Sequence, residues 1–394
     1  MRRSNAECEQ YKPFPWVVDV WKNSRLPTKK AERVLLACAH EYVHGPHVDY
    51  KLHKRLLAIS AHKKLKSIEF VSGRYMQTEG LFRDVPAETN EFFAWGNFFL
   101  YHQAQSSMYE NLNLINKKDF THQFTYYPGV PRLQRCKMIE EFAKANLLNS
   151  SIKYSWNGRP KSYNEAHADA RSTGLGPADF KFKFTNFDNQ RIIYYNDSTI
   201  DNTDNHQRIN HFSMPQEICK AAPFNIVMES DPVFDFLTEK TYRTLANGII
   251  PLLITAHKHY TYLQSLGFQF PQILLDFEST IPCQDVDDQD RRNKYYKVCN
   301  DRMFELVDTL RANWSDDLIA ECIKCGKHNQ LTAAKIVAGG QGIPKSNYIP
   351  LYYSHIINKA RFQATKYLRR NHIRYEPPPP LPYCGAFNHN DIPR

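Results

Sequence analysis

The sequence predicts an α/β fold of two domains with a C-terminal helical extension. Its 394 residues are about two domains long, and 42% of them are apolar, which suffices for ordinary hydrophobic cores. Apolar runs of strand length also alternate with helical segments, most clearly in residues 224–281. Strands that alternate with helices are typical of a parallel sheet covered by helices.

Residues 224–281 form the most informative unit. Phe224–Met228 reads as a buried strand and runs into the acidic loop 229–231. Thr238–Lys240 opens a helix with a threonine at the N-cap, Gly248 ends it, and Ile249–Ile254 reads as a second strand. Open α/β sheets bind ligands at the carboxyl ends of such strands, and a helix N-terminus with a lysine suits a phosphate. The unit therefore predicts a phosphate-bearing ligand.

A similar unit lies upstream. Phe124–Tyr127 reads as a strand, followed by the arginine-bearing turn Pro131–Arg135, a helix to about residue 148, and the strand Ile152–Trp156. Residues 157–220 are rich in Asn, Asp, Ser, Gly and Lys and predict a long loop, of a kind that is often functional.

The flanking regions complete the domain assignment. Residues 31–44 read as a helix, or as a strand followed by a loop; residues 50–65 read as a helix, and 67–72 and the aromatic-rich 92–101 as strands. Further helices are expected at 285–311, 315–325 and 349–370. We expect an N-terminal α/β domain over residues 1–115, a ligand-binding domain over 116–311, and a helical extension with a Pro-rich tail over 312–394.

The two units together resemble the donor-binding half of GT-B glycosyltransferases, specifically the fucosyltransferase-like group and its phage and viral relatives. The resemblance covers roughly residues 120–310 and consists of six matches in order. They are the turn with Arg132 and Arg135, the strand-end Glu229, Thr238–Thr241, Gly248–Pro251, Leu266–Phe268, and Asp276–Ser279, the last expected as an acidic strand.

The resemblance implies two Rossmann-like domains that face each other across a cleft, and sugar transfer from a nucleotide sugar to an acceptor hydroxyl. It implies that the donor is bound by Arg132, Arg135, Glu229, Thr238, Glu239 and Lys240. One glutamate would hold the ribose, and the cations would neutralise the diphosphate without a metal or other cofactor. The N-terminal domain would supply the catalytic base, for which Glu41 and His40 are the candidates. Whether the reaction retains or inverts configuration stays open.

A second motif supports a different enzyme. His40-Glu41-Tyr42-Val43-His44 is a literal HExxH, which on a helix would place two imidazoles on one Zn²⁺ with Glu41 as general base. Gly45-Pro46 follows at once, however, and ends the helix that a zinc peptidase continues. Cys322-x-x-Cys325-x-x-His328 has metal-like spacing without a clear fourth ligand. One alternative to a transferase is therefore a zinc metallopeptidase. The other is a binding protein that has the glycosyltransferase fold but no activity.

Composition restricts the partners. There is no apolar run of 18 residues, so membrane insertion is not expected, and nine scattered cysteines fit a reducing compartment and a cytoplasmic location. The net charge of +10 permits a polyanionic partner, or serves solubility alone. Either a glycan or modified DNA would suit as acceptor.

Overall fold

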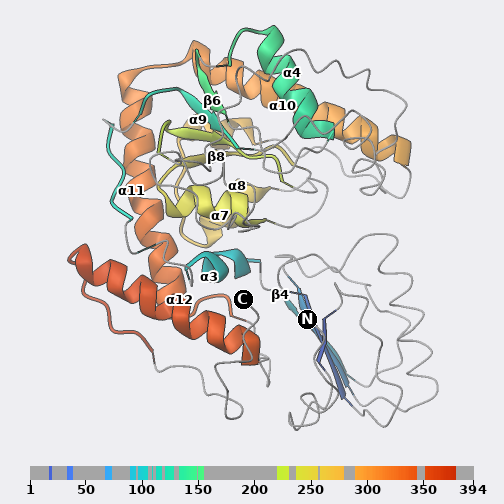
Figure 1. Cartoon of the computed structure of the whole chain (residues 1–394), viewed down its shortest axis with the longest axis vertical. Helices are drawn as coiled ribbons and strands as arrows, with labels where there is room; N and C mark the ends of the chain where they lie inside the picture. Colours follow the sequence, from blue (N-terminus) through green and yellow to red (C-terminus); the bar gives the residue numbers. More distant parts are fainter. Residues whose placement is uncertain are drawn as a thin grey trace, which may run out of the picture. The chain divides into compact units, whose positions relative to one another are not determined.

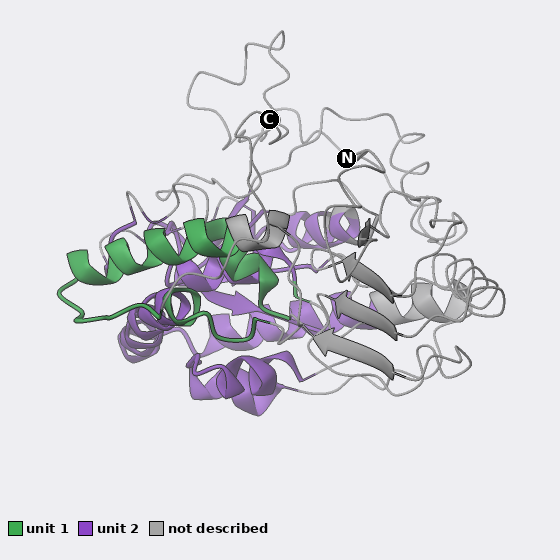
Figure 2. Cartoon of the chain, turned by 90° about the horizontal axis from the view of Figure 1, so that it is seen from below, with its two compact units in different colours: residues 1–105, 235–237, 336–394 green, residues 106–234, 238–335 purple. Residues whose placement is uncertain are grey.

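The computed structural model describes sixteen helices and strands and the segments that flank some of them. The described residues are 17–19, 33–38, 67–72, 89–94, 96–104, 109, 112–117, 120–127, 133–148, 150–154, 220–229, 237–255, 258–278, 289–343 and 351–378. They divide into two compact units (Figure 2), of which unit 1 takes residues 1–105, 235–237 and 336–394 and unit 2 takes 106–234 and 238–335.

Unit 1 contains a parallel sheet of four strands in the order β1-β2-β3-β4. The strands are β1 (Val17–Asp19), β2 (Arg33–Cys38), β3 (Ser67–Ser72) and β4 (Thr89–Ala94). Leu35 is in register with Val17 on one side and Glu69 on the other. Of the two interpretations of residues 31–44, the strand is therefore correct for 33–38, and the strand expected at 67–72 is confirmed.

The strand expected over residues 92–101 is only partly correct. β4 ends at Ala94, and the helix α3 (Phe98–Ala104) follows. Phe98, Tyr101 and Gln103 are all fully buried, so apolar and polar positions alike face protein. The aromatic content of this segment reflects a helix in which every side chain except that of His102 is buried, and periodicity does not distinguish such a helix from a buried strand.

The helix α12 (Leu351–Arg370) packs against α3 (Figure 1). The hydroxyl of Tyr101 on α3 donates hydrogen bonds to the carbonyls of Ile336, at 3.2 Å, and Gln341, at 2.5 Å. Arg361 of α12 donates through Nε to the carbonyl of Ala338 at 3.3 Å. The bonds to Ile336 and Ala338 reach carbonyls in the last turn of α11 (Asp316–Gly339), where the helix itself supplies no donor, and the bond to Gln341 reaches the segment that follows it.

Unit 2 contains a second parallel sheet, in the order β6-β5-β7-β8. Its strands are β5 (Phe124–Tyr126), β6 (Ile152–Tyr154), β7 (Phe224–Ile226) and β8 (Ile250–Leu252). The chain passes from β5 to its neighbour β6, then returns to place β7 on the other side of β5. The strand order therefore reverses between β5 and β7.

Helices surround this sheet in unit 2. They are α4 (Leu133–Lys144), α7 (Glu239–Ala246), α8 (His259–Ser265), α9 (Gln272–Phe277), α10 (Gln289–Ala312) and most of α11. Phe124 and Phe224 are in register and stack with centroids 6.0 Å apart, and Trp314 lies 6.0 and 6.2 Å from them. α10 packs against α4 (Figure 1), with Phe142 and Phe304 stacked 6.1 Å apart.

Two expectations for unit 2 need correction. The acidic strand expected at Asp276–Ser279 is wrong, because Asp276 and Phe277 end the helix α9. Pro271 stands at the start of that helix, where a residue without an N–H is tolerated. The helix expected at 315–325 runs on to Gly339, since Ala333, Ala334 and Val337 continue its buried face. Among the described residues, no helix is long and apolar enough to cross a membrane.

Candidate functional site

The reversal of strand order in unit 2 marks a place where the sheet can receive a ligand. The connections from β5 and β7 leave in opposite directions, and open α/β sheets bind ligands outside the carboxyl ends of two such neighbouring strands. The segment after β5 carries Arg135, and the segment after β7 carries Glu229 and then Lys240. The topology thus brings three charged candidates to one edge.

Glu229 anchors the first turn of α7. Its Oε1 accepts hydrogen bonds from the Thr238 N–H at 3.0 Å and from the Thr241 hydroxyl at 2.5 Å, and its Oε2 accepts from the Thr238 hydroxyl. The side chain of Thr238 in turn caps the helix by accepting from the N–H of Lys240. Glu229 is 3% exposed, so both carboxylate oxygens serve the helix N-terminus, where a negative charge is stabilising.

Glu239 and Lys240 form an ion pair beside this anchor. The Lys240 ammonium lies 2.6 Å from Glu239 Oε1 and also donates to the Thr238 hydroxyl at 3.2 Å. Burial opposes ionisation of Glu239, but Lys240 and then Arg243 outweigh it and lower its pKa to about 2. Burial also lowers the pKa of Lys240 from its usual value, and Glu239 offsets this only in part. The pair is largely enclosed, with side chains 20% and 13% exposed.

Arg135 reaches the same region from the first turn of α4. It is 2% exposed, and its Nη2 donates to the carbonyl of Met228, next to Glu229, at 3.1 Å. The Tyr126 hydroxyl donates to the carbonyl of Arg135 at 3.3 Å and holds the turn against β5. The positive charge of Arg135 is close enough to contribute to the lowered pKa of Lys240, after the larger effect of burial. Two cations from separate βα units thus influence each other here, beside the carboxylates of Glu239 and Glu229, which favour the charged form of Lys240.

A buried polar network, which the sequence did not reveal, orients α7. The Thr125 hydroxyl donates to Asn225 Oδ1 at 3.1 Å, and Asn225 Nδ2 donates to the Thr244 hydroxyl at 2.7 Å. Thr244 completes it by donating to the carbonyl of Lys240 at 2.7 Å. Thr125 and Asn225 are in register on β5 and β7. A polar residue at the centre of each of these apolar strands was the feature of the sequence that could have indicated the network.

A second glutamate anchors the next helix in the same manner. Glu278 accepts hydrogen bonds from the N–H groups of Tyr260 and Thr261, at 2.7 and 3.2 Å, and from the Thr261 hydroxyl at 2.7 Å. The resemblance placed this glutamate on a strand. In the structure it follows α9 and caps α8, with two of its three bonds exposed.

Some predicted site residues lie outside the described residues, namely Arg132, His40, Glu41 and His44. Cys322 and Cys325 of α11 are buried, and His328 Nε2 lies 2.8 Å from the carbonyl of Gly267. Within the described part of the chain, no group of three His, Cys, Asp or Glu side chains is arranged to hold a metal.

Comparisons with known proteins leave the site to be interpreted from its geometry. No model of a protein family matches the chain, and no curated protein matches its sequence.

Proposed function

We propose that the chain is a glycosyltransferase that transfers a sugar from a nucleotide sugar to an acceptor hydroxyl. The donor diphosphate would lie at the carboxyl edge of β5 and β7, between Lys240 and Arg135. One observation carries this proposal: Arg135 and Lys240, from the two βα units that flank the reversal of strand order, are near enough for the charge of Arg135 to lower the pKa of Lys240 at the N-terminus of α7.

The chemistry of sugar transfer explains this choice of groups. A nucleoside diphosphate leaves as the sugar is transferred, and negative charge develops on its phosphate oxygens. Fixed cations and oriented N–H groups stabilise that charge most effectively when they are already in place and shielded from water. Arg135 is buried and Lys240 is largely enclosed, and each is held by hydrogen bonds, so both conditions are met. No metal ion or other cofactor is required by this scheme.

The two glutamates would have different roles. Glu229 makes three hydrogen bonds to the start of α7 and acts as a positioning residue. Glu239 is more exposed and ionised throughout the neutral range, so we assign the ribose hydroxyls to it. Thr238 would connect the two groups, because its hydroxyl donates to Glu229 and accepts from the Lys240 ammonium that pairs with Glu239.

The complete enzyme would have the GT-B arrangement of two Rossmann-like domains, with the parallel sheet of β1–β4 belonging to the acceptor side. His40 and Glu41 follow the end of β2 in the sequence and are the candidates for the base that activates the acceptor. A glycan or a modified DNA base would be the acceptor. The zinc peptidase alternative depends on the HExxH motif alone, and no observation on the described residues favours it.

Titration calorimetry with nucleoside diphosphates tests the donor site. Lys240→Ala should weaken binding by roughly 1.5–3 kcal/mol, the range for charge-assisted hydrogen bonds. Lys324→Ala removes an exposed lysine of α11 and is the matched control, for which we expect unchanged affinity.

Incubation with nucleotide sugars then separates an enzyme from an inactive binding protein, because only the enzyme releases nucleoside diphosphate. If the folded Lys240→Ala protein binds nucleoside diphosphate as tightly as the wild type, the donor site does not lie at this edge of the sheet.

A further inference from the structure

The net positive charge of the chain arises from one segment. The chain has 51 Lys and Arg and 41 Asp and Glu, and residues 322–375 contain ten of the former and none of the latter. The rest of the chain therefore has 41 of each and is neutral. The ten basic residues are Lys324, Lys327, Lys335, Lys345, Lys359, Arg361, Lys366, Arg369, Arg370 and Arg374.

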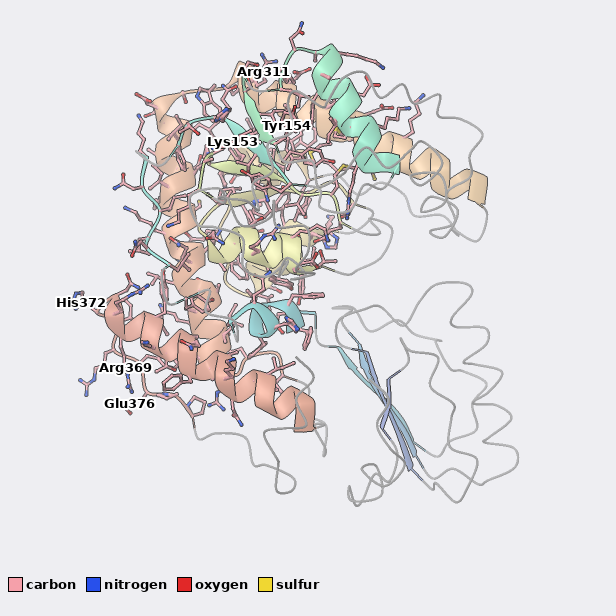
Figure 3. All side chains as sticks on the ribbon, in the orientation of Figure 1. Lys153, Tyr154, Arg311, Arg369, His372 and Glu376 are labelled. Atoms are coloured by element: carbon pink, nitrogen blue, oxygen red, sulfur yellow. The ribbon has the colours of Figure 1, made fainter. Side chains whose placement is uncertain are left out.

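The helix α12 has one buried and one exposed side. Six apolar side chains of its described part are buried within unit 1: Ile356, Ile357, Ala360, Ala364, Tyr367 and Leu368. Its exposed positions recur every three or four residues and form one stripe, which we call the basic face of α12. This face consists of Lys359, Phe362, Lys366, Arg369 and Arg370. Figure 3 shows Arg369 and, just after the helix, His372 projecting away from the ribbon.

Phe362 is the unusual member of this face. It is 67% exposed and is the large apolar side chain that the described part of the chain leaves open to solvent. A single exposed apolar residue is ordinary in itself. Its position is informative, because it stands about one helical turn from Lys359 and from Lys366 on the same face.

We propose that the basic face of α12 binds single-stranded nucleic acid. Lysine and arginine would contact successive phosphates, and Phe362 would stack on an unpaired base, the combination by which proteins bind single strands without sequence preference. From Lys359 to Arg370 the face is about 16 Å long, since a helix rises about 1.5 Å per residue. That is the length of roughly five nucleotides at the rise of a duplex strand.

The structure favours nucleic acid over an anionic membrane surface. A helix that lies in a membrane interface inserts a whole apolar face among the lipids. In α12 the described part of that face, including Ile357, Ala360 and Leu368, is already packed inside unit 1. Among the side chains of α12 whose burial the structure describes, Phe362 alone is apolar and exposed. A single strand of nucleic acid requires only cations for its phosphates and one aromatic ring for a base, and the basic face of α12 has both.

This inference goes beyond the proposed transferase activity and is independent of it. None of the residues of the basic face belongs to the donor site, so loss of nucleic-acid binding and loss of nucleotide-sugar binding are separate results.

Fluorescence anisotropy with a labelled oligothymidylate of about 12 nucleotides tests the proposal. Phe362→Ala should weaken binding about 5- to 150-fold, and Phe362→Tyr, which keeps a ring, should restore it. Replacing Lys359 and Lys366 together by glutamine should reduce the slope of log K against log salt by about 1.4, or about 0.7 per lost phosphate contact. The substituted side chains are exposed, so the fold should be retained, and circular dichroism checks this.

The matched control replaces Lys324 and Lys335, exposed lysines of α11, by glutamine. It loses the same charge within the same acid-free segment, and its salt slope should equal that of the wild type. The proposal is overturned if this control is impaired as much as the α12 variant, or if Phe362→Ala binds as well as the wild type. It is also overturned if phosphatidylserine vesicles or duplex DNA bind more tightly than the single strand.

Discussion

Replacing Glu229 by glutamine should loosen α7 without removing a ligand contact. The substitution keeps the size of the side chain and one carbonyl oxygen, which can still accept from the Thr238 N–H and the Thr241 hydroxyl. It removes the negative charge and turns the second oxygen into an NH₂ donor. That donor faces the Thr238 hydroxyl oxygen, which already accepts from both nitrogens of Lys240.

The magnitude follows from these contacts. Two hydrogen bonds lose their charge assistance, which costs about 1 kcal/mol each, and the helix N-terminus loses a favourable charge worth about 0.5 kcal/mol. The sum is about 2–3 kcal/mol in the free energy of local opening. Since about 1.4 kcal/mol corresponds to a factor of ten, amide hydrogens in the peptide spanning α7 should exchange about 30- to 150-fold faster.

Hydrogen exchange followed by mass spectrometry measures this, and Glu278→Gln is the matched control. Glu278 also accepts three hydrogen bonds at the start of a helix, but two of them are exposed, so α8 should change by less than about 1 kcal/mol. Nucleotide affinity of Glu229→Gln should fall less than that of Lys240→Ala. An unchanged exchange rate in α7, or equal effects of the two glutamine substitutions, would refute the assignment of Glu229 as a buried anchor.

Two further predictions follow from burial around α7. Burial lowers the pKa of Lys240, so its charge and the nucleotide affinity should decline as the pH rises through that lowered value. Lys240→Arg should abolish this alkaline decline in calorimetric titrations, because arginine stays protonated; an equal decline in both proteins would contradict it. Gly326→Ala should destabilise unit 2 by about 2 kcal/mol or more in urea unfolding, although alanine normally favours a helix, since its Cβ would lie 2.0 Å from the carbonyl oxygen of Gly248. If Gly326→Ala is instead more stable than the wild type, the backbone at Gly248 moves away from the added methyl group at little cost.

The sequence by itself determined the local elements of the ligand-binding unit. Apolar runs bounded by turns located β5, β7 and β8 to within one or two residues, and the capping preference of threonine located the start of α7 at Thr238. These features depend on neighbouring residues, so a single sequence contains them. The same reasoning failed at α3, where apolar content alone does not choose between a buried helix and a strand. At α9 it was the resemblance that wrongly placed a strand.

Only the tertiary structure decided which distant residues act together. The order β6-β5-β7-β8 brings Arg135 to Lys240, more than 100 positions away, and commits Glu229 to the N-terminus of α7. Burial of the opposite face of α12 likewise selects which of its basic residues meet solvent, namely Lys359, Lys366, Arg369 and Arg370. Strand order and burial arise from packing between distant segments, which the pattern along the chain does not record.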